Sequence, residues 1–147
     1  MEHAFVLNYF AEQPLKYDEA VIITPEVLQN IEIKFSLILK YKENVDYVGV
    51  QLDVAYVHED KQILTYSTLL TIFDTEWLNF LKGNPNEDAI REYALPWFDY
   101  AFNFTRGALA VRAKGTKVER LFLPMFDTTA SKQFILIDKV STEKIDK

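Results

Sequence analysis

The alternation of apolar and polar residues in the first half of the chain predicts three long strands. Over residues 31–42 apolar side chains occupy every second position, and Ile38 is the one apolar residue on the polar side. A period of two residues is typical of a half-buried strand. The pattern returns over residues 48–56 and 62–73, and short polar turns separate the runs, so we expect an antiparallel meander. A shorter apolar run at 5–10 predicts an N-terminal extended segment.

The second half of the chain has the features of helices. Asp74 is suited to cap a short helix over residues 76–82, and Gly83 is suited to end it. Asn86 is a second cap candidate, followed by two acidic residues that favour a first helical turn. We expect a long helix from this point to about residue 113.

Pro96 interrupts the long helix, so we expect either a kink or two helices, with Pro96 in the first turn of the second. A helix that only covers a sheet needs an apolar stripe about 100° wide. Here the apolar residues are spread more widely: Trp97 begins one face, and Phe98, Phe102 and Leu109 form a second. We therefore expect Phe98, Phe102 and Leu109 to lie at an interface with another copy of the chain.

The C-terminal part gives weaker signals. Residues 121–126 are apolar but contain Pro124, which favours an extended, edge-like segment. Residues 133–140 fit either a strand or a poor helix, and residues 141–147 form a polar tail that we expect to fray. Because no repeat or linker divides the chain, we expect one α+β domain over residues 1–147.

Composition excludes several kinds of chemistry. The chain of 147 residues has no cysteine, which excludes disulfides, thiolate metal sites and cysteine nucleophiles. Its four glycines are isolated, so no phosphate-binding loop is present, and no serine lies in a nucleophile elbow. His58, Glu59 and Asp60 are interpreted as a solvated turn, because adjacent turn residues rarely converge on one metal ion. We expect no enzymatic activity, no cofactor and no metal.

Charge and hydropathy bear on partners and location. The net charge is −6, which argues against nucleic-acid binding. No apolar run approaches the ~20 residues of a membrane span, and the first residues lack the features of a signal peptide, so we expect a cytoplasmic protein without membrane insertion. Five basic residues lie between 106 and 120, and five acidic residues lie within residues 1–30. We interpret both groups as charged side chains exposed to solvent. For the basic group, the alternative is a docking patch for an acidic partner.

The order of these elements resembles the SecB export chaperone family and its SecB-like relatives. The resemblance covers roughly residues 4–127, and it depends on order and spacing rather than on one motif. The long helix is entered through Ala94-Leu95-Pro96-Trp97 and continues through Thr105-Arg106-Gly107. An apolar segment with a proline follows, Leu121-Phe122-Leu123-Pro124-Met125-Phe126.

The resemblance implies a four-stranded antiparallel sheet packed against a long, Pro-interrupted helix. It implies an ATP-independent chaperone that binds unfolded or partly folded polypeptides, in protein export or for a restricted set of clients, and that assembles as a dimer of dimers. The polar tail at 141–147 differs from the basic, apolar docking tail of that family, so contact with the translocation motor is not among these expectations.

Aromatic residues make up 14% of the chain, and several lie where strands meet helices. A groove between sheet and helix would open at these junctions, so its candidate lining is aromatic: Phe73, Trp77, Phe80, Trp97 and Phe122. The alternative is ordinary core packing, since large aromatic side chains are usually buried. Two other functions stay open: a small-ligand-binding or enzymatic α+β domain with an apolar pocket between sheet and helix, and an assembly subunit whose helix face only makes oligomers.

Overall fold

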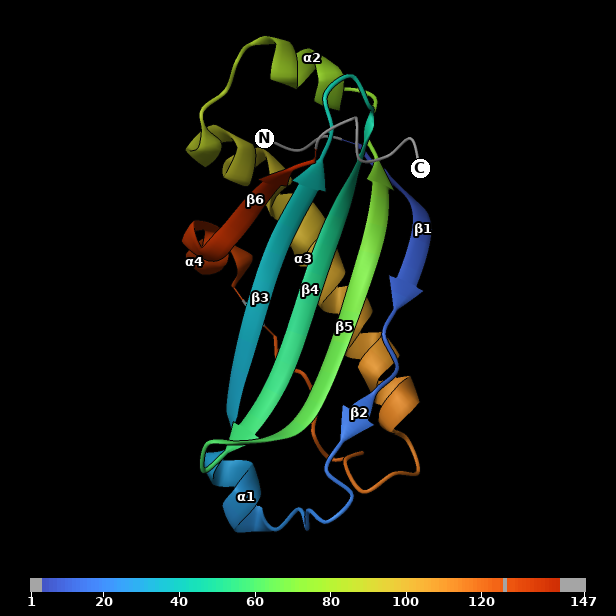
Figure 1. Ribbon diagram of the computed structural model, residues 1–147, viewed down its shortest axis with the longest axis vertical. Helices are drawn as coiled ribbons and strands as arrows, with labels where there is room; N and C mark the ends of the chain where they lie inside the picture. Colours follow the sequence, from blue (N-terminus) through green and yellow to red (C-terminus); the bar gives the residue numbers. More distant parts are fainter. Residues whose placement is uncertain (1–3, 126, 141–147) are drawn as a thin grey trace.

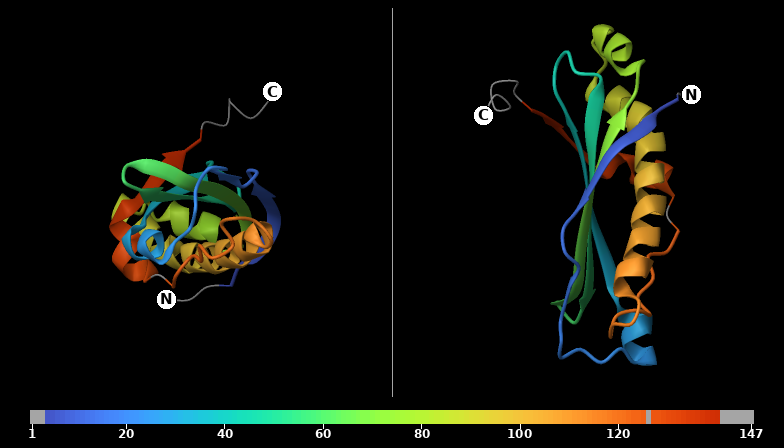
Figure 2. Two further views of the ribbon diagram at one scale, coloured as in Figure 1. Left: turned by 90° about the horizontal axis from the view of Figure 1, so that it is seen from below. Right: turned by 90° about the vertical axis from the view of Figure 1, so that its right-hand side faces the viewer.

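The structure is a computed structural model that describes residues 4–125 and 127–140. It has two layers, a twisted sheet and one long helix that runs diagonally across a single face of that sheet (Figures 1 and 2). The helices are α1 (Pro25–Asn30), α2 (Trp77–Lys82), α3 (Glu87–Ala113) and α4 (Thr128–Ser131), followed by the 3-10 turn η1 (Lys132–Phe134). The strands are β1 (Val6–Glu12), β2 (Lys16–Tyr17), β3 (Glu32–Tyr41), β4 (Tyr47–His58), β5 (Lys61–Phe73) and β6 (Ile135–Lys139).

The three central strands form the predicted meander. β3 pairs with β4 and β4 pairs with β5, all antiparallel, and the N-terminal strand β1 adds to the outer edge of β5. The strand order is β1-β5-β4-β3-β6, with the short β2 also pairing with β5. The prediction of an α+β fold is therefore confirmed, and β1, β5, β4 and β3 are antiparallel neighbours within the sheet.

The expected four-stranded antiparallel sheet is nevertheless wrong in its extent. In the described part of the chain the sheet has six strands and is mixed, because β6 runs parallel to β3, with Leu37 opposite Ile135. The sequence left residues 133–140 as either a strand or a poor helix, and the structure shows that they contain strand β6. Parallel neighbours need a long crossover connection. Between β3 and β6 the chain passes through β4 and β5, and α2 and α3 then carry it from the end of β5 across the sheet to β6 (Figure 1). The tail at 141–147 and Phe126 lie outside the described residues.

Helix α3 is continuous through Pro96 over its 27 residues. It begins where the sequence predicts, because the Asn86 side chain accepts a hydrogen bond from the amide of Ala89 at 2.8 Å. Pro96 cannot donate a hydrogen bond to the preceding turn. Trp97, the next residue, is fully buried, and its ring packs against those of Trp77 and Tyr93.

The wide apolar surface of α3 is covered by its own chain. Phe98, Phe102 and Leu109, the residues expected at an interface between copies, are at most 4% exposed and belong to the core. On one flank of the helix the ring of Phe104 lies 4.5 Å from that of Phe10, centre to centre. On the other flank α3 contacts α4, η1 and β6. The argument for a second chain at this helix therefore no longer applies.

Candidate functional site

The five aromatic residues expected to line a groove do not come together as one surface. Trp77 and Trp97 are 0% exposed, and Phe80 is half-buried beside them. Phe73 ends β5 with its side chain on the opposite face of the sheet, in register with Tyr47. Phe122 is exposed in the segment after α3. The structure thus unites only the three residues contributed by α2 and α3.

Those three residues belong to a closed aromatic cluster that joins α2 to α3 and β3. Its rings pack edge to face, stacked or tilted, with centres 4.2–5.7 Å apart; the members are Tyr41, Trp77, Phe80, Tyr93 and Trp97. The hydroxyl of Tyr93 donates to the buried carboxylate of Asp74 at 3.3 Å, and burial raises the pKa of Tyr93. Packing of this kind fixes the junction between β5 and α2 and leaves its members in the core.

The opposite face of the sheet is open. α3 covers one face only, and the view along the sheet edge shows no helix over the other (Figure 2). Antiparallel sheets often solvate one face, which is then polar. Here four large apolar side chains on the strands are exposed, and strand pairing places all four on this open face: Val6, Tyr9, Tyr47 and Leu136.

A row of mostly apolar residues crosses the open face from one edge to the other. Cross-strand partners lie on the same side of a sheet, and the register aligns one residue from each of five strands: Ala11, Leu69, Gln51, Ile38 and Leu136. In the sequence, Ile38 is the residue that broke the alternation of β3. An apolar residue at an outward-facing position of a strand, such as Ile38, was the sequence feature that indicated this surface.

Two adjoining hollows lie on this face and share Leu69 and Lys40. The first, of about 190 Å³, lies over Gly49 and is bordered by Tyr47, Thr71 and Val140; we call it the apolar hollow. Glycine leaves it open, because a Cβ at position 49 would lie 3.4 Å from the side chains of both Leu69 and Lys40.

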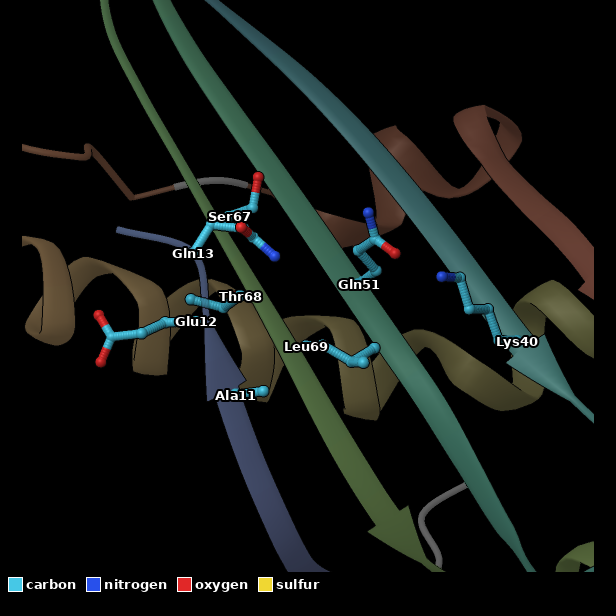
Figure 3. A pocket seen from close by; sticks show the side chains of 8 residues that line it. All are labelled: Ala11, Glu12, Gln13, Lys40, Gln51, Ser67, Thr68 and Leu69. Atoms are coloured by element: carbon cyan, nitrogen blue, oxygen red, sulfur yellow. The ribbon is translucent and has the colours of Figure 1, made fainter. Parts of the chain in front are cut away.

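The second hollow, of about 210 Å³, is lined mainly by polar side chains, and we call it the polar hollow. Figure 3 looks onto it with α3 behind the strands. Its polar groups come from four strands or their ends: Gln13, Lys40, Gln51 and Ser67. The Gln51 amide donates to both carboxylate oxygens of Asp53 at 3.1 Å, so its own carbonyl oxygen stays available to a ligand.

The charged side chains that line the two hollows are mostly basic. Lys40 lines both hollows and Lys42 lines the apolar one. Among the described lining residues the only acid is Glu12, whose side chain points away from the polar hollow (Figure 3). The Arg112 guanidinium and the Tyr66 hydroxyl both bind Glu12, and they lower the pKa of its carboxyl to about 2.

No family model matches the chain, and no curated protein matches it. The resemblance to the SecB family therefore depends on the order of elements and on the residues quoted above. None of the helices in the described part is long and apolar enough to cross a membrane. At the turn between β4 and β5 the imidazole of His58 lies 3.7 Å from the carboxylate of Glu59, and the described residues hold no cluster of three or more metal-ligating side chains.

The basic segment near the end of α3 is partly neutralised within the chain. Arg112 pairs with Glu12, and the ammonium of Lys117 donates to the backbone carbonyl of Glu19. Two of the basic residues thus bind the acidic N-terminal part of the chain. These contacts fasten the strand β1 and the segment after β2 to the C-terminal end of α3.

Proposed function

We propose that this chain is an ATP-independent chaperone that binds unfolded or partly folded polypeptides on the open face of its sheet. One observation carries the proposal: two adjoining hollows lie on a sheet face that exposes Tyr9, Tyr47 and Leu136. Contiguous exposed apolar surface on a soluble protein marks an interaction site. Polypeptides that have not folded expose the apolar side chains such a surface would cover.

The spacing of the hollows fits an extended chain. Gly49 lies beneath the apolar hollow and Gln51 beneath the polar one, two residues apart on β4. Two residues of a strand span ~6.8 Å, and side chains on one side of an extended polypeptide have the same spacing. A client lying along β4 would therefore place alternate side chains in the two hollows.

The resemblance to the SecB family supports the same class of function. Only part of the implied architecture supports this: β1, β5, β4 and β3 are antiparallel neighbours beside the long helix α3, within a mixed sheet of six strands in the described residues. We propose a role in protein export or in serving a restricted set of clients. Assembly as a dimer of dimers remains part of this proposal, and the native mass measured by sedimentation tests it: a tetramer supports the resemblance and a strict monomer contradicts it.

The alternative of a ligand pocket between sheet and helix receives less support. The largest fully buried side chains of the core occupy that space, among them Trp77, Trp97, Tyr66 and Phe98. The hollows that carry the proposal lie on the other side of the sheet. Polypeptide binding is accordingly favoured over a small-molecule site in the interior.

Suppression of the aggregation of a chemically denatured client tests the proposal. We expect the wild-type chain to suppress aggregation at stoichiometric excess, and Leu136→Ser and Gly49→Val to be several-fold less effective. Gly49→Val fills the apolar hollow, and because valine favours strands more than glycine does, it should not unfold the sheet. Thermal melting confirms that each variant is folded.

The matched control is Val111→Ser, which removes an exposed apolar side chain from α3. It should suppress aggregation as well as the wild type does, because it lies on the helix rather than on the open sheet face. Absence of suppression by the wild type would contradict the proposed function. Equal activity of all the variants would contradict its placement on the open face.

A further inference from the structure

The two hollows differ in chemistry, and this difference bears on which client segments bind. The apolar hollow offers Tyr47, Leu69 and Val140 to a side chain. The polar hollow offers the Lys40 ammonium, the Ser67 hydroxyl and the Gln13 amide as donors, whereas the Gln51 amino group already binds Asp53. A hydroxyl, an amide and an ammonium can all donate hydrogen bonds to a carboxylate.

Among the described residues, Lys40 is the one charged side chain that lines both hollows. In the described residues no carboxylate lies within 4.0 Å of its ammonium. Asp138 occupies the neighbouring position on β6 without forming an ion pair with it. Glu12, the one acid in the lining, is neutralised by Arg112. An acidic group entering the polar hollow would therefore meet an ammonium that has no ion-pair partner among the described residues.

The negative net charge of the chain does not determine whether a carboxylate binds in the polar hollow. Charges further apart than ~8 Å are largely screened at physiological ionic strength. A carboxylate in the polar hollow would lie within hydrogen-bond reach of Lys40, well inside that distance. The nearest charged side chain in the lining, Lys40, therefore determines whether the hollow prefers an acidic or a basic ligand group.

Building on the proposed function, we infer that this face selects extended polypeptide segments in which an apolar residue and an aspartate or glutamate are separated by one residue. The apolar side chain occupies the hollow over Gly49. The carboxylate occupies the hollow over Gln51 and binds Lys40. Lys40 is thus a specificity-determining residue, and the two-residue spacing along β4 sets the spacing of the recognised pair.

Fluorescence anisotropy with three labelled peptides tests this inference on the full chain. The peptides share flanking glycine and serine residues and a leucine, and two positions after the leucine they carry aspartate, asparagine or lysine. We expect the aspartate peptide to bind about 2- to 5-fold more tightly than the asparagine peptide, the size of a partly exposed ion pair. The lysine peptide should bind most weakly.

Two lysine variants on the same strand sharpen the test. Lys40→Gln should abolish the preference for aspartate, so that the ratio of the dissociation constants of the asparagine and aspartate peptides falls to about one. Lys34→Gln is the matched control: it lies on β3 and lines neither hollow, so its preference should equal that of the wild type.

The possible failures are distinguishable. If all three peptides bind with equal affinity, or if Lys40→Gln keeps the preference, the inferred selectivity is wrong and polypeptide binding stands. If no peptide binds and the wild type also fails to suppress aggregation, the proposed function is wrong. If sedimentation shows that copies of the chain cover this face in place of peptide, and Gly49→Val separates them, a second copy is the occupant and the inference is overturned.

Discussion

A buried hydrogen bond between two threonine side chains joins the sheet to the long helix. The hydroxyls of Thr68 on β5 and Thr105 on α3 lie 2.8 Å apart, and both side chains are buried. Each hydroxyl has lost its water, so each depends on the other. A buried polar group without a partner costs about 1–3 kcal/mol, whereas apolar replacement of both partners is close to neutral.

This pair gives a non-additive prediction for stability. Thr105→Val should lower the free energy of unfolding by about 1–3 kcal/mol, because it leaves the Thr68 hydroxyl unsatisfied. The double variant Thr68→Val/Thr105→Val should recover much of that loss. Urea denaturation of the wild type, both single variants and the double variant measures the effect, and strictly additive losses would contradict this role of the pair.

Glu12 is the second residue with a testable energetic role. Arg112 and Tyr66 hold its pKa at about 2, below the ordinary value of 4.5. A depressed pKa in the folded state adds stability above pH 4.5, and this stability is lost as the pH falls from 4.5 towards 2. Glu12→Gln should lower the melting temperature at pH 7 by roughly 2–4 °C.

The pH dependence separates this charge effect from a packing effect. The gap in melting temperature between the wild type and Glu12→Gln should narrow as the pH falls below 4.5. Glu32→Gln, at an exposed position on β3, is the control and should show almost no gap. A gap for Glu12→Gln that stays constant from pH 7 to pH 3 would exclude the ion pair as its cause.

At the scale of elements, long periodic segments were predictable and the short strand β6 was not. The period-two alternation over 31–42 corresponds to β3, and the cap at Asn86 marks the start of α3. In β6, Ile135, Leu136 and Ile137 are consecutive apolar residues without alternation, so the sequence could not orient the strand. Its parallel pairing with β3 depends on the path of the chain across α3, which no local pattern encodes.

Neighbouring residues of β6 should respond differently to substitution. Ile135 is 1% exposed and faces α3, whereas Leu136 is 59% exposed on the open face. Ile135→Ala should destabilise the chain by about 2–5 kcal/mol, because it leaves a cavity in the core. Leu136→Ala should change stability by about 0.5 kcal/mol or less. The denaturant midpoints of the two variants measure the difference, and similar losses of stability in both would contradict the assignment of β6.

At the scale of the whole molecule, the candidate site could not be predicted from any one segment. Trp77 and Trp97 were expected in a groove, but the fold places them in a closed cluster. The open face is built instead from the outward residues of five strands, such as Ile38 and Leu69, which become one surface only through the strand register. The sequence pattern marked Ile38 alone as an exception to alternation and did not show that it aligns with Leu69.

The central claim is that unfolded polypeptide binds on the open face of the sheet. Titration of the isotope-labelled chain with an unfolded client, followed by NMR chemical-shift changes of backbone amides, tests it most directly. We predict that the largest changes occur at Gly49, Gln51, Leu69 and Thr71, with little change near Val111 on α3. Changes confined to α3, or absent from the four strand positions at saturating client, would contradict the claim.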